Sequence, residues 1–401
     1  MPDGLALNDD QLDRLAKLGD PEVDLLVANS LGSASSSSAS SSSGSVELEM
    51  RRMVALGRVE GSDANDYFNE EVPLPSWADH DKLYLARDFF QSWGLQLSMG
   101  LYFGSLPRSY TAARGARALT VAGGMNDNLQ RRIAETGQFL IDVMAMDDPG
   151  VPLGPGSDGQ RAARGVRLFH GVVRNWLSAE SDRWDDETHG VPINQEDMLA
   201  TVLLFSVAAL DALDRMGIPY SDEQAEAYVH AWCVAGALMG VGSAADQVPD
   251  IGLFLPLGYA EARKLGFHIE TRHQKASPDG EELAAALIDH ARDLTPFGLR
   301  WMPRTMLGEI ATPEVASLLG IRRGPRLAHW LIAILRPINR VAFTLFRITP
   351  FGAAGALLGR IIIRAYIKLG RGDRPPWAFT NPLQQWKQRR RQLATRRHAP
   401  L

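Results

Sequence analysis

Residues 161–177, RAARGVRLFHGVVRNWL, form the stretch from which the rest of the chain is best interpreted. Val166, Phe169, His170 and Val173 recur at three- and four-residue steps, which predicts an amphipathic helix with one apolar face. His170 lies in the middle of that face. Because burying a ring nitrogen without a partner costs free energy, the imidazole must find a hydrogen bond, a water or a metal. On residue type alone, a hydrogen-bonded core histidine is the more common outcome.

The composition indicates a globular protein. The chain has 401 residues, of which 45% are hydrophobic and 22% are charged, enough for one large domain or two small ones. Its single cysteine, Cys233, excludes an intramolecular disulfide and any metal site with several cysteine ligands. The N-terminus has neither the basic nor the apolar region of a secretion signal, so we expect a cytoplasmic location.

The charge is distributed unevenly along the chain. Residues 315–401 hold 17 Lys and Arg but one acid, Asp373, whereas the whole chain has a net charge of −5. Within this part, residues 327–369 combine bulky aliphatic side chains with basic ones and contain no acid. Arginine recurs there too often for a membrane span. Two interpretations stay open: a segment peripherally associated with an anionic membrane surface, or helices packed on the core with their arginines outward.

Helical periodicity dominates from Trp77 onward, and no run of alternating strand-type segments occurs. We therefore predict an all-α protein. Asn194 is a natural N-cap, and Ser221 with Gln224 has the pattern of a capping box. The predicted helices span residues 79–97 with a continuation that breaks at Pro107, and then 111–122, 128–146, 160–180, 195–216, 221–241, 257–266, 279–293 and 313–319.

The region before Trp77 is predicted to be less compact. One short helix is expected over residues 9–26, and another over residues 46–57. Between them, the serine-rich residues 30–45 cannot bury apolar surface and are typical of a flexible linker. These features predict three parts: a flexible N-terminal segment (1–60), a helical domain (61–320) and a basic amphipathic C-terminal region (321–401).

Polar side chains on two further predicted helices accompany His170. Arg132, Glu135 and Thr136 follow one another within about a turn, and Arg132 and Thr136 share one helix face because they are four residues apart. Thr201 lies four residues before Phe205 on the next long helix but one, with the same geometric consequence.

Four pieces of sequence around these residues resemble, in order and spacing, the oxygenase family that contains the bacterial rubber oxygenase latex clearing protein and fungal endoplasmic-reticulum oxygenases that trim prenyl side chains. The resemblance covers about residues 77–319. The pieces are R-x-x-x-T at Arg132–Thr136, V-R-L-x-H-x-x-V-R at Val166–Arg174, G-x-P-I-N-Q-E-D at Gly190–Asp197 and Y-x-x-x-W-x-x-x-G at Tyr228–Gly236.

The resemblance implies a helical, partly globin-like fold with a b-type haem. It maps the proximal iron ligand onto His170 and two pocket residues onto Arg132 and Thr136. A neutral imidazole on a dry helix face suits iron ligation. An arginine such as Arg132 or Arg167 can pair with a haem propionate, and Thr201 is a further candidate for the cofactor pocket.

The chain departs from the family pattern at Glu135, where the rubber-cleaving members carry a lysine. A carboxylate beside haem needs a cationic partner, and Arg131 and Arg132 are the nearest in sequence. Glu135 could act as a general base for an allylic proton or could be a salt-bridged helix residue, which is the more common role. Without a secretion signal, we expect a small or membrane-dissolved apolar substrate rather than a polymer.

Several other polar residues have structural interpretations. His230 is expected to be a core or surface histidine. Glu196 and Asp197 follow Asn194 in a first helical turn, where carboxylates interact favourably with the helix dipole. Cys233 is expected to be buried and inert because apolar residues follow it.

Two hypotheses of different classes follow. The first is a haem-dependent oxygenase that acts on an unsaturated apolar substrate, such as an isoprenoid, with dioxygen. The second is a non-enzymatic helical protein that binds lipid or membrane surfaces through its basic C-terminal region. Nucleic acid is not an expected partner, because the arginines alternate with aliphatic residues rather than with polar and stacking ones.

Overall fold

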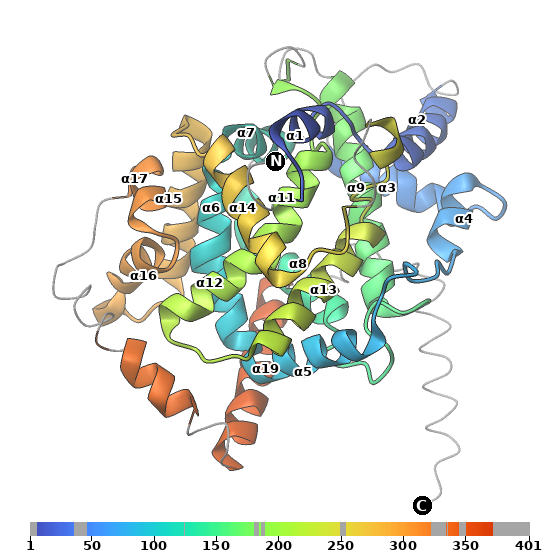
Figure 1. The fold of residues 1–401 in the computed structure, drawn as a ribbon. Helices are drawn as coiled ribbons and strands as arrows, with labels where there is room; N and C mark the ends of the chain where they lie inside the picture. Colours follow the sequence, from blue (N-terminus) through green and yellow to red (C-terminus); the bar gives the residue numbers. More distant parts are fainter. Residues whose placement is uncertain are drawn as a thin grey trace, which may run out of the picture.

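The computed structural model describes residues 6–35, 46–123, 125–179, 184–185, 189–248, 254–321, 334, 336–344 and 350–371. The fold is all-α, as predicted: in these ranges the only β-type pairing is an isolated bridge between Ala112 and Gln274. Residues 36–45 of the predicted linker over residues 30–45, and the basic tail after residue 371, lie outside the described residues. Figure 1 shows how the helices are arranged, with α5 (His80–Gly100) and α13 (Asp222–Leu238) among those that other helices surround.

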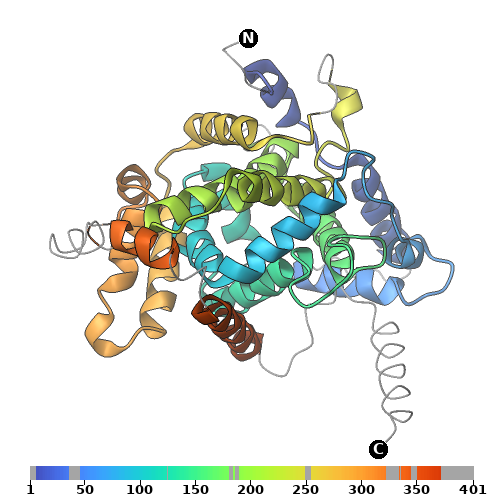
Figure 2. The same ribbon diagram turned by 60° about the horizontal axis from the view of Figure 1, so that its bottom comes forward.

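Two long helices form the centre of the fold. α5 and α13 lie side by side, as Figure 2 shows. The side chain of Asp79 caps α5, and the predicted capping box of Ser221 and Gln224 begins α13. Both helices bury large aromatic side chains against each other, with the rings of Phe89 and Tyr228 5.6 Å apart.

The predicted break at Pro107 is wrong. α5 continues through a π-helical turn, η1 (Leu101–Ser105), into α6 (Leu106–Tyr110), with Pro107 at the start of α6. A proline has no backbone N–H and clashes with the preceding turn of an α-helix. The change to π-helical geometry directly before Pro107 provides a place where that missing donor is tolerated.

Helices α8 (Met125–Val143), α9 (Asp158–Ala179) and α11 (Gln195–Phe205) carry three of the sequence pieces singled out above. Asn194 accepts a hydrogen bond from the Asp197 N–H at 2.9 Å, which confirms the predicted N-cap of α11.

The single helix predicted over residues 195–216 is interrupted. Ser206 has non-helical dihedral angles and separates α11 from α12 (Val207–Met216). Gly217 ends α12 with a positive φ of 75°, a conformation that favours glycine.

The N-terminal region is more ordered than predicted. The helix expected over 9–26 is two helices, α1 (Asp9–Leu15) and α2 (Pro21–Ser35), because Pro21 begins a new helix. α2 extends into the serine-rich run, and α3 (Val46–Leu56) packs against both α2 and α9. These helices bury apolar side chains in two core clusters, so the prediction of a flexible segment over 1–60 does not hold for them. The buried side chains include Leu7, Leu12, Leu15, Val23, Val27, Met50 and Met53.

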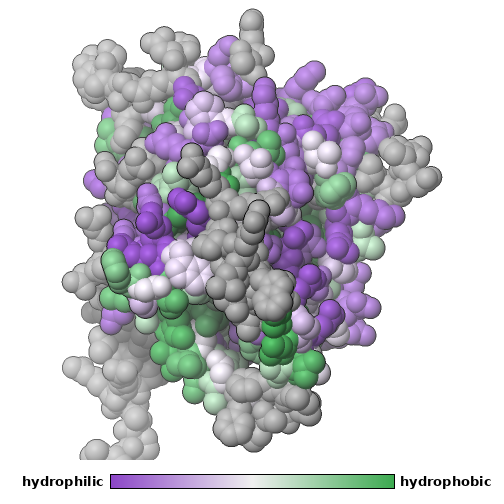
Figure 3. Space-filling model, turned by 90° about the vertical axis from the view of Figure 1, so that its left-hand side faces the viewer, coloured by the Kyte–Doolittle hydropathy of each residue, from purple (hydrophilic) through white to green (hydrophobic). Residues whose placement is uncertain are grey.

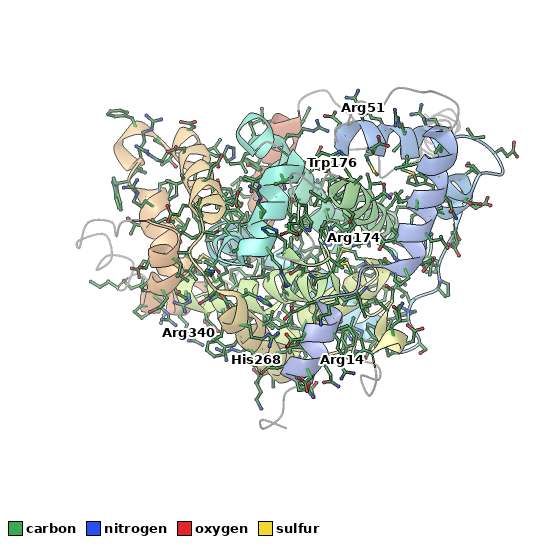
Figure 4. The ribbon with its side chains drawn as sticks, turned by 90° about the horizontal axis from the view of Figure 1, so that it is seen from above. Arg14, Arg51, Arg174, Trp176, His268 and Arg340 are labelled. Carbon is green, nitrogen blue, oxygen red and sulfur yellow. The ribbon has the colours of Figure 1, made fainter. Side chains whose placement is uncertain are left out.

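The remaining helices pack around those described above. α7, α15 and α17 lie close to the predicted ranges, α14 extends well beyond the predicted end at residue 266, and α4 and α16 were not predicted. Their bounds are α4 (Asp63–Asn69), α7 (Ala113–Gly123), α14 (Tyr259–His273), α15 (Pro278–Asp293), α16 (Met302–Ile310) and α17 (Pro313–Leu318); two 3-10 turns, η2 (Ala245–Gln247) and η3 (Phe297–Leu299), lie between them. Figure 4 shows α1, which carries Arg14, near the part of α14 that carries His268; the Nε2 atom of His268 donates to Asp9 Oδ1 at 2.8 Å.

The described part of the C-terminal region packs on the core. α19 (Pro350–Arg371) contacts α5 and α8, with Ile363 and Ile367 buried against the glycines Gly94 and Gly137. The helical residues 336–344 contact the end of α12 through a hydrogen bond from Asn339 to the Met216 carbonyl. In the described residues, no helix combines the length and the apolar character that crossing a membrane requires.

Candidate active site

A large cavity lies between α6, α8, α9, α11, α12, α13 and α14. Its volume is about 1840 Å³, roughly twice the upper end of the 300–1,000 Å³ that is usual for small-molecule sites. Five of the residues that line it come from α9, namely Val166, Phe169, His170, Val173 and Trp176. The first four of these residues form the apolar face predicted from their spacing, so the face that the sequence pattern would place in the core instead faces a cavity.

His170 is the central polar residue of this wall. Its side chain keeps some accessible surface, yet its Nδ1 atom is inaccessible and has no hydrogen-bond partner among the described residues. The expectation that a core histidine would be hydrogen-bonded is therefore not met at this atom. Burial, with a smaller contribution from the positive charge of Arg174, lowers the pKa of His170 to about 3. The imidazole is consequently neutral at physiological pH, which is the form that binds metals.

Arg167 does not belong to the cavity wall. Its Nε and Nη2 atoms donate to the two carboxylate oxygens of Asp20 at 2.6 and 2.8 Å, and Nη2 also donates to Glu22 at 2.7 Å. Asp20 is fully buried. The guanidinium is thus committed to the N-terminal helices, and the expectation that Arg167 would contact a cofactor is corrected by this geometry.

Arg174, one turn after His170, points to the same N-terminal region. It donates to Asp24 at 2.8 Å and to the Ile193 carbonyl at 2.9 Å. Figure 4 shows Arg174 and Trp176 on α9, with α3 and its Arg51 beside that helix.

The three candidate residues of α8 do line the cavity. Arg132, Glu135 and Thr136 are all half-buried in its wall. Burial lowers the pKa of Arg132, partly offset by Tyr110 and Glu135. Thr136 donates its hydroxyl hydrogen to the Arg132 carbonyl at 2.9 Å and keeps its acceptor capacity.

Glu135 has the cationic partner that its position required. Arg131 Nε donates to Glu135 Oε1 at 2.8 Å, and the two side chains are equally exposed, at 23%. The prediction of a salt-bridged helix residue is therefore confirmed. Both partners line the cavity, so the ion pair is also part of its surface.

Thr201 also lines the cavity, from α11. Its side chain is exposed, and its hydroxyl donates to the Asp197 carbonyl one turn earlier at 2.8 Å. The structure thus brings His170, Arg132, Glu135, Thr136 and Thr201 to one cavity and leaves Arg167 outside it.

An aromatic cluster forms another part of the cavity wall. The rings of Phe205 and Trp232 are 4.8 Å apart, and Phe139 lies 6.1 Å from Trp232. The Trp232 Nε1 atom is buried without a hydrogen-bond partner among the described residues. Residue-by-residue reasoning missed Trp232 as a site residue, although it is the tryptophan of the fourth sequence piece.

The last residue of that piece has a packing role. A Cβ atom at Gly236 would lie 2.7 Å from a methyl group of Val202, so glycine is needed where α13 approaches α11 closely.

The acidic residues at the start of α11 do more than interact with the helix dipole. Glu196 is 1% exposed, accepts a hydrogen bond from Arg114 at 3.4 Å and lies 2.8 Å from His273 Nε2. Arg114 also contacts Asp197 at 3.3 Å, and burial raises the pKa of the Asp197 carboxyl. Both acids line the cavity as parts of an ion-pair network.

The remaining predictions from residue type are confirmed. His230 is buried outside the cavity wall, and its Nε2 accepts a hydrogen bond from the Asp79 N–H at 2.9 Å. Cys233 is buried, and that burial raises the pKa of its thiol to about 11. Across the described ranges, no three or more His, Cys, Asp or Glu side chains come together as metal ligands would.

Comparison with known proteins identifies the family to which this chain is similar. The family model described as "ER-bound oxygenase mpaB/B'/Rubber oxygenase, catalytic domain" matches residues 91–346. Rubber oxygenase from Streptomyces sp. (strain K30) is 25% identical over 282 residues, which are 69% of this chain and 64% of that relative. This chain therefore spans somewhat less than two thirds of the relative's length.

The fold has a solved counterpart. The structure of latex clearing protein in the closed state superposes with a TM-score of 0.66 at 20% sequence identity, covering 88% of this chain and 91% of that one. Because the family model covers more than half of the chain, and because the four sequence pieces lie within it, this chain belongs to the family of ER-bound oxygenases and rubber oxygenases.

Proposed function

We propose that this protein is a haem-dependent oxygenase that oxidises or cleaves an unsaturated apolar substrate, isoprenoid or lipid-like, with dioxygen. The observation that carries the proposal is the neutral imidazole of His170, whose Nδ1 atom has no hydrogen-bond partner among the described residues, in the wall of a large cavity, in a chain of this oxygenase family.

The residues present fit a b-type haem. A lone histidine suits a cofactor that brings its other iron donors with it, as a porphyrin does. The cavity volume of about 1840 Å³ leaves room for a second, apolar ligand next to a porphyrin. His170 would hold the iron. Arg132, the half-buried guanidinium in the wall, would pair with a propionate in place of Arg167.

Haem, when bound, supplies the dioxygen chemistry, and the protein supplies the ligand, the orientation and a dry site. The aliphatic and aromatic side chains of α9 and α13 exclude water and hold the alkene. Thr136 and Thr201 would offer hydroxyl groups for orienting polar atoms in the cavity.

Glu135 would be the proton-accepting group for an allylic hydrogen. Its ion pair with Arg131 keeps the carboxylate charged, which a base requires. The same pair must loosen for the carboxylate to accept a proton, so Glu135→Gln should slow turnover without removing haem.

The test uses squalene as an unsaturated apolar compound and measures oxygen uptake together with labelled carbonyl products from ¹⁸O₂. Wild-type protein loaded with haem should consume oxygen and incorporate the label, and Arg132→Ala should lower the rate. Arg117→Ala, an exposed arginine of α7 outside the cavity wall, is the matched control. Uptake that stays at the rate of free haem would contradict the proposal.

A second candidate function, association with an anionic membrane surface, is favoured by the C-terminal helices. α19 buries one side against the core and exposes aliphatic side chains on the other. Figure 3 shows hydrophobic side chains gathered at the lower end of one face of the molecule. The exposed aliphatic residues are Leu357, Leu358, Ile361, Ile362 and Leu369 on α19, and Ile338 and Val341 on residues 336–344.

Basic side chains accompany this apolar surface. Arg340, Arg364 and Lys368 are exposed in the same helices, and no acid occurs in residues 327–369. Such a combination suits the boundary between acyl chains and anionic headgroups.

Sedimentation with vesicles tests this second function. We expect binding to vesicles of phosphatidylcholine with phosphatidylserine, weakened by salt, and loss of binding in the triple variant L357S/L358S/I361S. The control Leu25→Ser removes a similarly exposed leucine from α2. Equal binding of the triple variant and the control would contradict the surface assignment.

A further inference from the structure

The cavity that contains His170 has a second, charged end. Arg108 of α6, Arg215 of α12, and Arg263 and Lys264 of α14 also line it. We call these four side chains the cationic end. They come from three helices, so the fold and not a single run in the sequence brings the cluster together.

Two of these cations, Arg108 and Arg263, share one carboxylate partner, Asp211. Arg108 is buried and contacts Asp211 at 3.5 Å and Glu270 at 3.7 Å. Arg263 also contacts Asp211, at 3.4 Å. One carboxylate thus serves two guanidinium groups, and the four cations share this part of the cavity lining with three acids, Asp211, Glu270 and Glu314.

Among the described residues, Arg215 is the half-buried side chain of this end that has no direct partner, whereas Lys264, also without an ion pair, is exposed. In the part of the chain that the structure describes, Arg215 makes neither an ion pair nor a hydrogen bond, although it is half-buried. Burial and the positive charges of Arg108 and Arg336 lower the pKa of Arg215, and the carboxylates of Asp211 and Glu314 offset this in part. An arginine stays protonated in proteins, and no acceptor among the described residues contacts this guanidinium directly, so an anionic group in the cavity would be a favourable partner for it.

The spacing between the two ends suits a long ligand. α11 and α12 follow each other along the cavity, and Thr201, Phe205, Ala208, Asp211 and Arg215 all line it. At a rise of about 1.5 Å per residue, Arg215 lies on the order of 20 Å from Thr201 along the helices. The wall between them includes the aromatic cluster around Trp232.

We propose that the substrate is an anionic amphiphile whose carboxylate or phosphate head binds Arg215 and whose unsaturated apolar chain extends toward His170. This inference rests on the proposed function and specifies its substrate class. A charged head at Arg215 would fix how far the chain enters, and therefore which double bond reaches the reacting centre.

The test compares ligands that share one tail. Geranylgeranyl monophosphate, geranylgeraniol and inorganic phosphate are titrated into the full-length, haem-loaded protein by calorimetry. A charge-assisted hydrogen bond to a half-buried arginine predicts that the phosphate ester binds at least about tenfold more tightly than the alcohol. Arg215→Gln should remove that preference and leave the affinity for geranylgeraniol unchanged.

Two further variants complete the design. Arg215→Lys should keep part of the preference, which separates charge from loss of structure. Arg300→Gln, an exposed arginine paired with Asp293 outside the cavity wall, should keep all of it. Circular dichroism establishes that each variant is folded.

Three results would overturn the inference: equal affinities of the ester and the alcohol, an unchanged preference in Arg215→Gln, or no binding of either tailed ligand. Inorganic phosphate binding as tightly as the ester would assign a simple anion site and would also overturn it. If oxygen uptake with squalene persists in any of these cases, the oxygenase function stands and the head-group inference alone fails.

Discussion

The two sides of α9 satisfy their polar groups in opposite ways. On one side, Arg164 contacts Glu70 and the Tyr67 carbonyl at 2.8 Å each, and Arg167 is held by the buried Asp20. On the other side, a single imidazole, that of His170, faces the cavity with its Nδ1 atom unpartnered. Carboxylates of the N-terminal region thus neutralise Arg164 and Arg167, whereas none of the described residues hydrogen-bonds the Nδ1 atom of His170.

This contrast separates structural from functional polar groups on one helix. A residue whose partners come from the protein contributes to folding, and its removal should lower stability. A residue that the protein leaves unpartnered costs stability until a ligand binds, because a buried polar atom has lost its water. The predictions below test each side of α9 and its neighbour α8.

The largest effect is expected for Arg167→Ala. Removing the guanidinium leaves Asp20 buried with an uncompensated charge, which should lower the free energy of unfolding by about 3–5 kcal/mol. Urea denaturation measures the change. The double variant D20N/R167M should recover much of the loss, because it removes both charges. A loss below about 1 kcal/mol in Arg167→Ala would mean that the pair is not structural.

A smaller, pH-dependent effect is expected for His170→Leu. The pKa of His170 is about 3 in the folded protein and about 6.5 in the unfolded chain, so protonation favours unfolding. Its stabilising contribution is complete above pH 6.5 and is lost as the pH falls toward 3. Between pH 7 and pH 5, the wild type should therefore lose about 2 kcal/mol more than His170→Leu does.

Urea denaturation at the two pH values gives this difference directly. His80→Leu, which removes an exposed histidine at the start of α5, should keep the pH dependence of the wild type. If His170→Leu shows the wild-type pH dependence as well, the imidazole is not held neutral in the cavity wall.

The smallest effect is expected for Glu135→Gln on α8. Its ion pair with Arg131 spans one helical turn at a partly exposed position, and such pairs contribute about 0.3–0.5 kcal/mol. The thermal midpoint of the haem-free protein should therefore hardly change. If Glu135→Gln lowers the free energy of unfolding by about 2 kcal/mol or more, the carboxylate of Glu135 has a structural role like that of Asp20 and is not free to react with a substrate.

Much of the fold could be predicted from the sequence, because helices are local. The period of apolar residues in 161–177 predicts α9, and Asn194 and Ser221 begin α11 and α13 as their capping patterns indicate. Predictions failed where distant contacts decide. The N-terminal helices are ordered by packing against α9, which no local pattern near residues 9–35 reveals.

The site was predictable only in part, for the same reason. The apolar periodicity indicates the face on which His170 lies but does not distinguish a core from a cavity. Arg167 and Arg132 look alike in sequence, and only the position of Asp20 removes Arg167 from the site. Nothing in the local sequence singles out Arg215, because its environment depends on side chains that α6, α17 and residues 336–344 place near it.

The central claim is that His170 holds a haem iron. The most direct test is the pyridine haemochrome assay on the protein as purified, with His170→Ala and His230→Ala compared at equal concentration. His230 is the matched control, because it is a buried histidine that already accepts a hydrogen bond from Asp79. We expect about one haem per chain in the wild type and in His230→Ala, and nearly none in His170→Ala. Equal haem content in all three proteins, or no haem in the wild type, would contradict the account.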